Sequence, residues 1–191
     1  VAGVASFGGR AAYLGKVAAD QLGDVYEHDM KAIGVAFDTT RLTGGPATAR
    51  SMINVTPDGQ RTMCTYLGAS TELTPEDVPA DIVEQSAIVY LEGYLFDPAP
   101  ARAAFEAAAA AAHAAGRRVA ITLSDTFVVA RWRAELLAFI EASADIVLAN
   151  EGELAALFET EDFDAAAAQL AAIVEIAAVT RGEHGSVVIK G

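Results

Sequence analysis

The segment Asp145-Ile-Val-Leu-Ala-Asn-Glu-Gly-Glu153 decides the fold class, because it joins a buried strand to the start of a helix. The apolar run Asp145–Ala149 predicts the strand, and Asn150–Phe158 predicts a helix with Asn150 as its N-cap. The same alternation predicts strands at Ala87–Leu91, Arg118–Leu123, Ile173–Thr180 and Ser186–Lys190, and helices at Pro100–Ala115, Ala130–Ser143 and Asp164–Ala172. Buried strands that alternate with helices predict an α/β fold with a mostly parallel sheet covered on both faces.

The first third of the sequence has a different rhythm. A short strand is predicted at Ala11–Val17, followed by a helix from the N-cap Asp20 to Ile33. Three short antiparallel strands are then expected, at Val35–Thr43, Ala47–Thr56 and Gln60–Leu67. The break Pro57-Asp-Gly59 predicts a hairpin turn between the last two. We therefore expect a small β-lid inserted at residues 35–67.

Length, charge and cysteine content limit the classes of protein to which this chain could belong. The 191 residues suffice for one domain with a substantial core, and no apolar stretch is long enough to cross a bilayer. A formal net charge of −13 argues against nucleic acid and anionic membranes as partners. Cys64 is the only cysteine, so an internal disulfide is excluded and a reducing, cytoplasmic location is expected. We expect Cys64 to be a small packing residue rather than a nucleophile.

Several familiar catalytic motifs do not occur. No G-x-G-x-x-G follows a strand, and no G-x-S-x-G nucleophile elbow exists. The stretch Gly9–Val17 resembles a Walker loop but is one residue too long and ends in Val17 instead of a hydroxyl residue. The three histidines are scattered without metal-ligand spacing. These observations direct attention to the carboxyl ends of the parallel strands, where open α/β sheets bind ligands.

The first candidate site follows the strand that ends at Ala149. Asn150 caps the next helix, whose N-terminal dipole favours an anion. Glu153 lies one turn further on and could hold a hydrated magnesium ion. The same spacing also satisfies a capping box with no ligand, and sequence logic alone slightly favours that second interpretation.

Two other strand ends carry suitable groups. Thr180 ends a strand and is followed by a turn with Gly182 and Gly185, where a nucleotide could approach the bare backbone. The alternative is an ordinary turn between two strands. After Arg118–Leu123, Asp125 is either the cap of the next helix or a site carboxylate, and neither interpretation prevails.

Taken in order, these segments resemble the PfkB (ribokinase-like) family of sugar and nucleoside kinases, and its adenosine-kinase branch in particular. The similar stretches are Val1–Gly23, Asp58–Ala69, Tyr90–Tyr94, Thr122–Asp125, the N-x-x-E motif at Asn150–Glu153 and the T-x-G-x-x-G turn at Thr180–Gly185. The resemblance covers essentially the whole chain. It implies a three-layer α/β/α fold, with residues 1–191 forming an incomplete kinase domain.

The resemblance also implies cofactors and roles. ATP and Mg²⁺ are expected, with Asn150, Thr180, Gly182 and Gly185 at the nucleotide and Glu153 at the metal ion through water. The lid would contact a small-molecule substrate, a nucleoside or a sugar, and the lid candidates are Phe37, Met63 and Tyr66. Such kinases often pair through the lid sheet, so a homodimer is also expected.

Two family segments are missing from the 191 residues, and the first is a Gly-Gly pair with an asparagine that contact substrate, expected before Val1. The family's D-T-x-G-A-G-D signature, which supplies the general base, does not occur here and is expected beyond Gly191. We therefore expect a chain truncated at both ends and inactive by itself, although the intact protein would be a kinase. Three alternatives stay open: a pseudokinase that only binds a ligand, a nucleotide-binding domain without phosphotransfer, and a ribose or fructose kinase.

Overall fold

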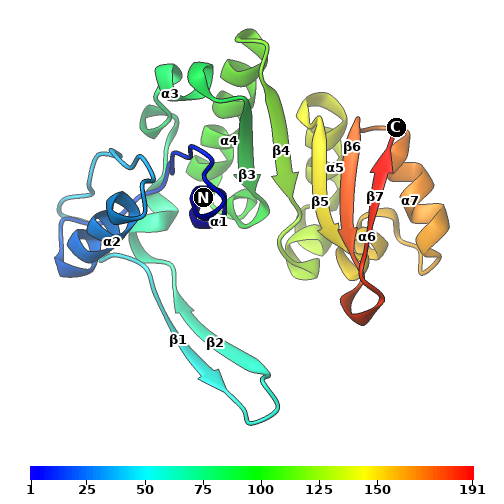
Figure 1. Ribbon diagram of the computed structural model, residues 1–191, viewed down its shortest axis with the longest axis horizontal. Helices are drawn as coiled ribbons and strands as arrows, with labels where there is room; N and C mark the ends of the chain where they lie inside the picture. Colours follow the sequence, from blue (N-terminus) through cyan, green and yellow to red (C-terminus); the bar gives the residue numbers. More distant parts are fainter. The chain divides into compact units, whose positions relative to one another are not determined.

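A computed structural model describes residues 1–191, and the chain divides into two units, Val1–Val78 and Pro79–Gly191. Figure 1 shows the elements of both units. No helix is both long and apolar enough to span a bilayer.

The second unit is built on a five-stranded sheet in the order β3-β4-β5-β6-β7. Its strands are β3 (Ile88–Glu92), β4 (Arg118–Thr122), β5 (Ile146–Asn150), β6 (Ile176–Thr180) and β7 (Ser186–Lys190). The first four strands are parallel, and β7 is antiparallel to β6. The predicted strands therefore form one mostly parallel sheet.

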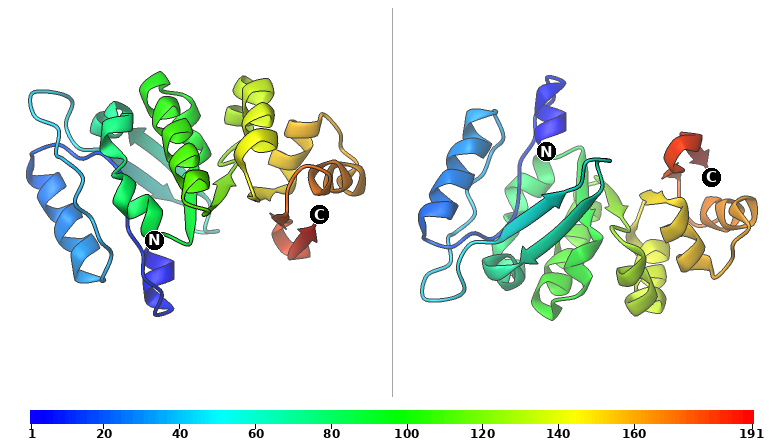
Figure 2. Two further views of the ribbon diagram at one scale, coloured as in Figure 1. Left: turned by 90° about the horizontal axis from the view of Figure 1, so that it is seen from above. Right: turned by 90° about the horizontal axis from the view of Figure 1, so that it is seen from below.

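The helices of this unit are α3 (Ala80–Gln85), α4 (Ala99–Ala114), α5 (Thr126–Ser143), α6 (Glu151–Phe158) and α7 (Phe163–Ala171). Two 3₁₀ turns, η3 (Gly93–Phe96) and η4 (Gly182–His184), follow β3 and β6. Because the strands are added in sequence order with the same handedness, the connecting helices α4 to α7 lie on one side of the sheet (Figure 2). The central side chains on that face are fully buried, namely Val119, Ile121, Val147, Ala177 and Val179.

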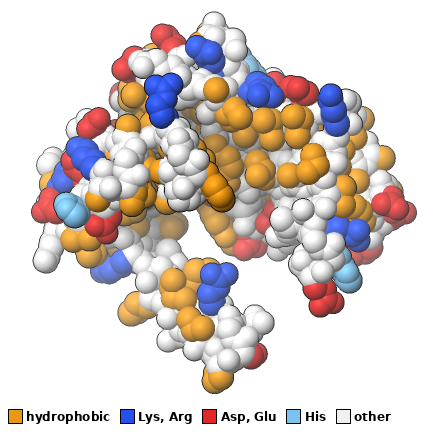
Figure 3. Space-filling view, in the orientation of Figure 1, with side chains coloured by type: hydrophobic (Ala, Val, Ile, Leu, Met, Phe, Trp, Pro, Cys, Tyr) orange, Lys and Arg blue, Asp and Glu red, His pale blue; other side chains and the backbone are white.

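The opposite face of the sheet is apolar but open within this unit. Ile88, Tyr90 and Val188 on this face are 43%, 55% and 72% exposed. Figure 3 shows hydrophobic side chains gathered over the sheet. The α/β fold class is confirmed, with a mostly parallel sheet here and a small antiparallel sheet in the first unit. The predicted cover on both faces is not seen within this unit, because its helices lie on one side of the sheet.

The first unit contains α1 (Ala2–Ser6), α2 (Gln21–Ala32), a hairpin of β1 (Arg50–Val55) and β2 (Arg61–Tyr66), and the 3₁₀ turns η1 (Gly68–Glu72) and η2 (Pro75–Asp77). Its core holds an aromatic cluster in which the rings of Tyr13, Tyr26 and Phe37 have centroids 5.7 Å apart in each pair. Phe37 is only 1% exposed. The residues after α2 therefore pack against that helix.

This packing corrects the predicted three-stranded lid. Residues 35–43 and 11–17 are not strands; they run alongside each other with two isolated parallel bridges, Ala12 to Ala36 and Ala18 to Leu42. Within residues 35–43, Val35 and Phe37 are buried in the core of the first unit, and the segment does not pair with β1. Only the hairpin of β1 and β2 forms the expected antiparallel sheet.

The predicted role of Cys64 was also wrong. Cys64 is exposed on β2, opposite Met52. Every residue of β1 and β2 is exposed, so no core exists beneath the hairpin in which a small thiol could pack.

Candidate functional site

The register of the sheet brings the carboxyl ends of the parallel strands together. Glu92 is paired with Thr122 across β3 and β4, and Asn150 is paired with Thr180 across β5 and β6. The two predicted motifs at Asn150 and Thr180 therefore begin on neighbouring strands at one edge. This is the edge at which parallel α/β sheets bind ligands.

Asn150 and Glu153 form the reciprocal capping box that their spacing predicted. Asn150 Oδ1 accepts a hydrogen bond from the Glu153 N–H at 2.8 Å, and Glu153 Oε2 accepts one from the Asn150 N–H at 2.9 Å. The Asn150 side-chain amide also donates to Glu153 Oε1 at 2.8 Å. Glu153 is only 4% exposed, so its carboxylate is held in one orientation at the start of α6.

The electrostatic environment of Glu153 favours a nearby cation. Burial raises the pKa of Glu153, the hydrogen bond from the Asn150 N–H lowers it, and the charges of Asp125 and Glu92 raise it further. A divalent cation would offset both the burial and the repulsion. No three acidic, histidine or cysteine side chains lie close enough to hold a metal ion directly. Mg²⁺ prefers oxygen ligands and retains several waters, so a carboxylate oriented like that of Glu153 is a group that such an ion could contact through water.

The turn after β6 presents bare backbone. Gly182 and Gly185 have φ angles of 54° and 84°, and a Cβ built on either would meet nothing within 4 Å. The Arg181 N–H closes the turn by donating to the Gly185 carbonyl at 2.8 Å. Thr180 is exposed at its start. The predicted turn is confirmed, and its glycines leave open space in which a ligand could lie.

Arg181 is a feature of this turn that sequence reasoning missed. Its guanidinium lies over the ring of Phe163, with Cζ 3.9 Å from the centroid. Its Nε also donates to Glu151 Oε2 at 3.2 Å. The signal available in the sequence was a single basic residue between Thr180 and Gly182. The contacts fix a positive charge beside the N-terminus of α6.

The ends of β3 and β4 are joined by close polar contacts. Ser124 has a φ of 71°, and its hydroxyl donates to Glu92 Oε1 at 2.6 Å. Asp125 caps α5 by accepting from the Phe127 N–H at 3.2 Å, which confirms its helix-cap interpretation. A Cβ on Gly93 would lie 2.6 Å from the Thr122 carbonyl oxygen, so only glycine fits there.

The three lid candidates do not come together. Phe37 is buried in the aromatic cluster of the first unit, whereas Met63 and Tyr66 are 59% and 43% exposed on β2. Met63 and Tyr66 are three residues apart and therefore face opposite sides of the hairpin. Arg50 lies over the Tyr66 ring, with Cζ 4.8 Å from its centroid. Only Met63 and Tyr66 are accessible to a ligand.

Comparison with known proteins identifies the family to which the chain belongs. Residues 1–191 match the pfkB family of carbohydrate kinases. The crystal structure of adenosine kinase from Sinorhizobium meliloti is 57% identical with a TM-score of 0.96, and the match covers 100% of this chain and 58% of that one. A probable sugar kinase protein from Rhizobium etli CFN 42 is 51% identical with a TM-score of 0.96, over the same shares of the two chains.

A more distant relative is named a fructokinase, in contrast to the adenosine kinase and the probable sugar kinase above. Probable fructokinase-6, chloroplastic, from Arabidopsis thaliana is 28% identical over 168 residues, which are 84% of this chain and 43% of that protein. The chain thus spans little more than half the length of the two structures and less than half of this relative.

Proposed function

Because the chain belongs to the pfkB family of carbohydrate kinases, we propose that the protein is an ATP-dependent phosphotransferase acting on a hydroxyl of a nucleoside such as adenosine. The observation that carries this proposal is the pairing of Asn150 with Thr180. It places the capped N-terminus of α6 next to a glycine turn on the neighbouring strand. Together these features suit an anionic nucleotide.

Four residues are proposed to hold the nucleotide. The first N–H groups of α6 have no acceptor within the helix, and Asn150 fixes the start of that helix. Thr180 offers a hydroxyl, and Gly182 and Gly185 let the backbone approach the ligand closely. The neighbouring Arg181, which is paired with Glu151, lies between Thr180 and Gly182. Phosphate binding by backbone N–H groups is compatible with the strongly acidic composition.

Glu153 is proposed to act on Mg²⁺ through water. When bound, the ion would neutralise charge on the transferring phosphoryl group. Glu153 would accept a hydrogen bond from a water of the ion, because its own oxygens are already oriented by Asn150. A buried carboxylate with fixed geometry can position such a water without a direct metal bond.

Adenosine is proposed as the acceptor because the adenosine kinase from Sinorhizobium meliloti is 57% identical over the whole chain. A sugar is the second candidate, since the Rhizobium etli protein is named a probable sugar kinase and is 51% identical. Because Met63 and Tyr66 face opposite sides of the hairpin, one of the two is proposed to contact the acceptor. Either side chain, apolar or aromatic, suits a nucleoside base better than a free sugar.

The 191 residues alone are proposed to bind nucleotide without transferring phosphoryl. They contain no D-T-x-G-A-G-D segment. The resemblance to the family implies that this segment supplies the general base. We further propose a homodimer through the hairpin, where Met52, Ile53 and Val55 are 72%, 53% and 64% exposed. A cytoplasmic location completes the proposal and rests on the single cysteine.

Two measurements test the proposal at different levels. Titration of the 191-residue chain with a fluorescent ATP analogue should show binding that strengthens when Mg²⁺ is added. ADP release by the full-length gene product should then be measured with adenosine, other nucleosides, fructose and ribose. Release that depends on adenosine supports the proposal, release only with a sugar selects the second candidate, and no release with any acceptor would overturn phosphotransfer.

A further inference from the structure

The β1–β2 hairpin is joined to the rest of the first unit through a small root. We define the root as Ala47 and Thr48, where the chain enters the hairpin, and Gly68 and Ala69, where it leaves. The Ala69 N–H donates to the Ala47 carbonyl at 2.9 Å. A Cβ on Gly68 would lie 2.1 Å from that same carbonyl oxygen, so the two sides of the root are in direct contact. Beyond the root, all twelve residues of β1 and β2 are exposed.

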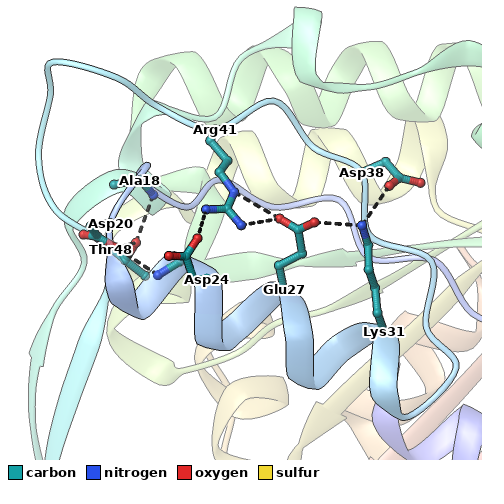
Figure 4. Close-up of polar contacts among 9 residues, drawn as sticks. Ala18, Asp20, Asp24, Glu27, Lys31, Asp38, Arg41 and Thr48 are labelled. Atoms are coloured by element: carbon teal, nitrogen blue, oxygen red, sulfur yellow. Dashed lines mark hydrogen bonds and ion pairs between the residues drawn. The ribbon is translucent and has the colours of Figure 1, made fainter.

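Thr48 is the part of the root that reaches into the first unit. It is only 4% exposed. Its hydroxyl accepts a hydrogen bond from the Ala18 N–H at 2.9 Å and donates one to Asp20 Oδ1 at 2.7 Å. Its backbone N–H donates to Asp20 Oδ2 at 2.9 Å (Figure 4). Thr48 therefore contacts the loop before α2 and the cap of α2 at once.

Asp20 connects this contact to the helix. It is the N-cap of α2 and accepts a hydrogen bond from the Gly23 N–H at 2.8 Å. A Cβ on Gly23 would lie 2.2 Å from the Ala18 carbonyl oxygen, which keeps the helix start close against the loop. The hydrogen bond from the Thr48 hydroxyl is the main cause that holds the pKa of Asp20 below its usual value. Asp20 thus joins the helix and the hairpin root as a charged acceptor.

Helix α2, whose N-cap contacts the root, also forms ion pairs with the residues that follow it in the chain. Arg41 forms ion pairs with Asp24 and Glu27 on α2, and Lys31 pairs with Glu27 and with Asp38 (Figure 4). Residues 38–41 therefore lie along the helix and are paired with it at both ends. The root joins a fixed body to an exposed arm, and a small change of angle at Thr48 moves the far end of the hairpin by a larger distance.

We propose that Thr48 is a positioning residue: its hydroxyl, held by Asp20, sets the direction in which the hairpin leaves the first unit and thereby the affinity for the acceptor. The acceptor part of this inference rests on the proposed function, in which the hairpin contacts the acceptor. The direction of the hairpin is a property of the first unit alone. The two parts can be tested separately.

The direction of the hairpin can be followed in the 191-residue chain through the distribution of distances between two spin labels. Cys64 is the only native cysteine and is exposed on β2, and a second label site is His28→Cys on α2, where the native side chain is 80% exposed. Thr48→Val keeps the shape but removes the hydroxyl, and should broaden the distance distribution roughly twofold, because a buried charge-assisted hydrogen bond is lost. Thr48→Ser, which retains a hydroxyl, should restore the narrow distribution.

A matched control is available on the hairpin itself. Thr65 bonds only to Ser51, at 2.9 Å across the two strands, and is exposed. Thr65→Val makes the same chemical change away from the root and should leave the distribution as in the parent chain. If Thr48→Val fails to unfold cooperatively on heating, Asp20→Asn replaces it, because asparagine still caps α2 but cannot accept from the Thr48 N–H. An unchanged distribution in the variant that folds overturns the inference.

The acceptor effect is measured in the full-length protein. Thr48→Val should raise the KM for the acceptor by about tenfold and leave the KM for ATP unchanged, and Thr48→Ser should reverse most of the change. If the distance distribution broadens while the KM for the acceptor stays unchanged, Thr48 sets the direction of the hairpin but does not affect the affinity for the acceptor. If no acceptor is phosphorylated by the parent protein, the proposed function fails, while the distance measurement still decides whether Thr48 sets the direction of the hairpin.

Discussion

Asn150 and Thr180 occupy the last paired position of β5 and β6, so the capping box of α6 and the glycine turn after β6 start side by side. Neither feature alone distinguishes a ligand site from ordinary helix and turn chemistry. The capping box is satisfied without any ligand, since the Asn150 side chain and the Glu153 carboxylate bond to each other. The neighbouring turn, whose two positive-φ glycines face open space, is likewise a stable turn without a ligand, so the case for a site rests on the two features starting side by side.

Replacement of Glu153 by glutamine separates the capping role from the proposed metal role. Glutamine at this position still completes a capping box, so the thermal unfolding midpoint should change little. The variant loses the charge that would act on hydrated Mg²⁺. We expect Mg²⁺-dependent turnover of the full-length protein to fall by about 100-fold, as for other outer-shell ligands.

The control for this change is Glu161→Gln, which alters an exposed glutamate between α6 and α7. It should leave the magnesium dependence as it is. Equal magnesium titration curves for Glu153→Gln and the parent protein would refute the assigned role of Glu153.

The protonation of Glu153 gives a prediction that needs no catalysis. Because its pKa is raised in the folded state, the folded chain holds this proton more tightly than the unfolded chain. The resulting contribution to stability is present below the ordinary glutamate pKa of 4.5 and is lost as the pH rises through the folded pKa. Relative to Glu153→Gln, the parent chain should therefore lose unfolding free energy as the pH rises from 4 to 7.

Paired urea titrations at several pH values measure this difference. Subtracting the curve of Glu153→Gln removes the other carboxyl groups, including Asp20 and Asp97, whose lowered pKa values act in the opposite direction. A difference between the two proteins that stays constant with pH would contradict the raised pKa.

The glycine turn can be tested with a matched pair of substitutions. Gly182 and Gly116 have φ angles of 54° and 66°, and in neither case would a Cβ meet another atom within 4 Å. Valine at either position should cost a similar 1–2 kcal/mol or so of stability from the backbone conformation alone. Only Gly182→Val should raise the KM for ATP, by about tenfold, since its side chain would enter the proposed nucleotide space.

Nucleotide titration of both variants, at a temperature where both are folded, makes the comparison. An increase shared by both variants would point to general destabilisation. An unaltered ATP dependence in Gly182→Val would remove the nucleotide from this turn.

The sequence predicts the second unit better than the first for a physical reason. In Asp145–Phe158, a strand run, an N-cap and a helix agree with one another, and the boundaries differ from prediction by one residue at most. In residues 35–43, the strand formers Val35 and Phe37 pack in the core of the first unit, and tertiary contact decides the conformation of the segment. The start of α5 at Thr126 was also missed, because Asp125 caps a first turn rich in strand formers.

The candidate site shows the same limit. Local spacing predicted the contact between Asn150 and Glu153 because it lies within one turn. The stack of Arg181 on Phe163 and the exposure of Cys64 depend on which distant residues the fold brings near, and no local pattern carries that information. Phe37 became a lid candidate for its residue type, whereas its neighbours Tyr13 and Tyr26 make it a core residue.

The last prediction concerns the joint between η3 and α5 in the second unit. Asp97 accepts a hydrogen bond from Trp132 Nε1 at 2.7 Å and two from Arg131 Nη1 at 2.9 Å. The hydrogen bond from Trp132 is the main cause that lowers the pKa of Asp97, with Arg131 adding to it. Trp132 has non-helical φ and ψ angles of −120° and 25°, so the contact lies where α5 departs from regular geometry.

Trp132 is the only tryptophan, so its fluorescence reports on this joint. Because the folded pKa of Asp97 is lowered, the stabilising contact is present above the unfolded pKa of about 3.8 and is lost as the pH falls through the folded value. The emission of Trp132 should therefore shift to longer wavelength in a transition centred below pH 3.8. Asp97→Asn, which lacks the titrating group, should lose this transition, whereas Asp81→Asn on α3 should keep it. A transition centred above pH 3.8, or one that persists in Asp97→Asn, would show that another group controls the joint.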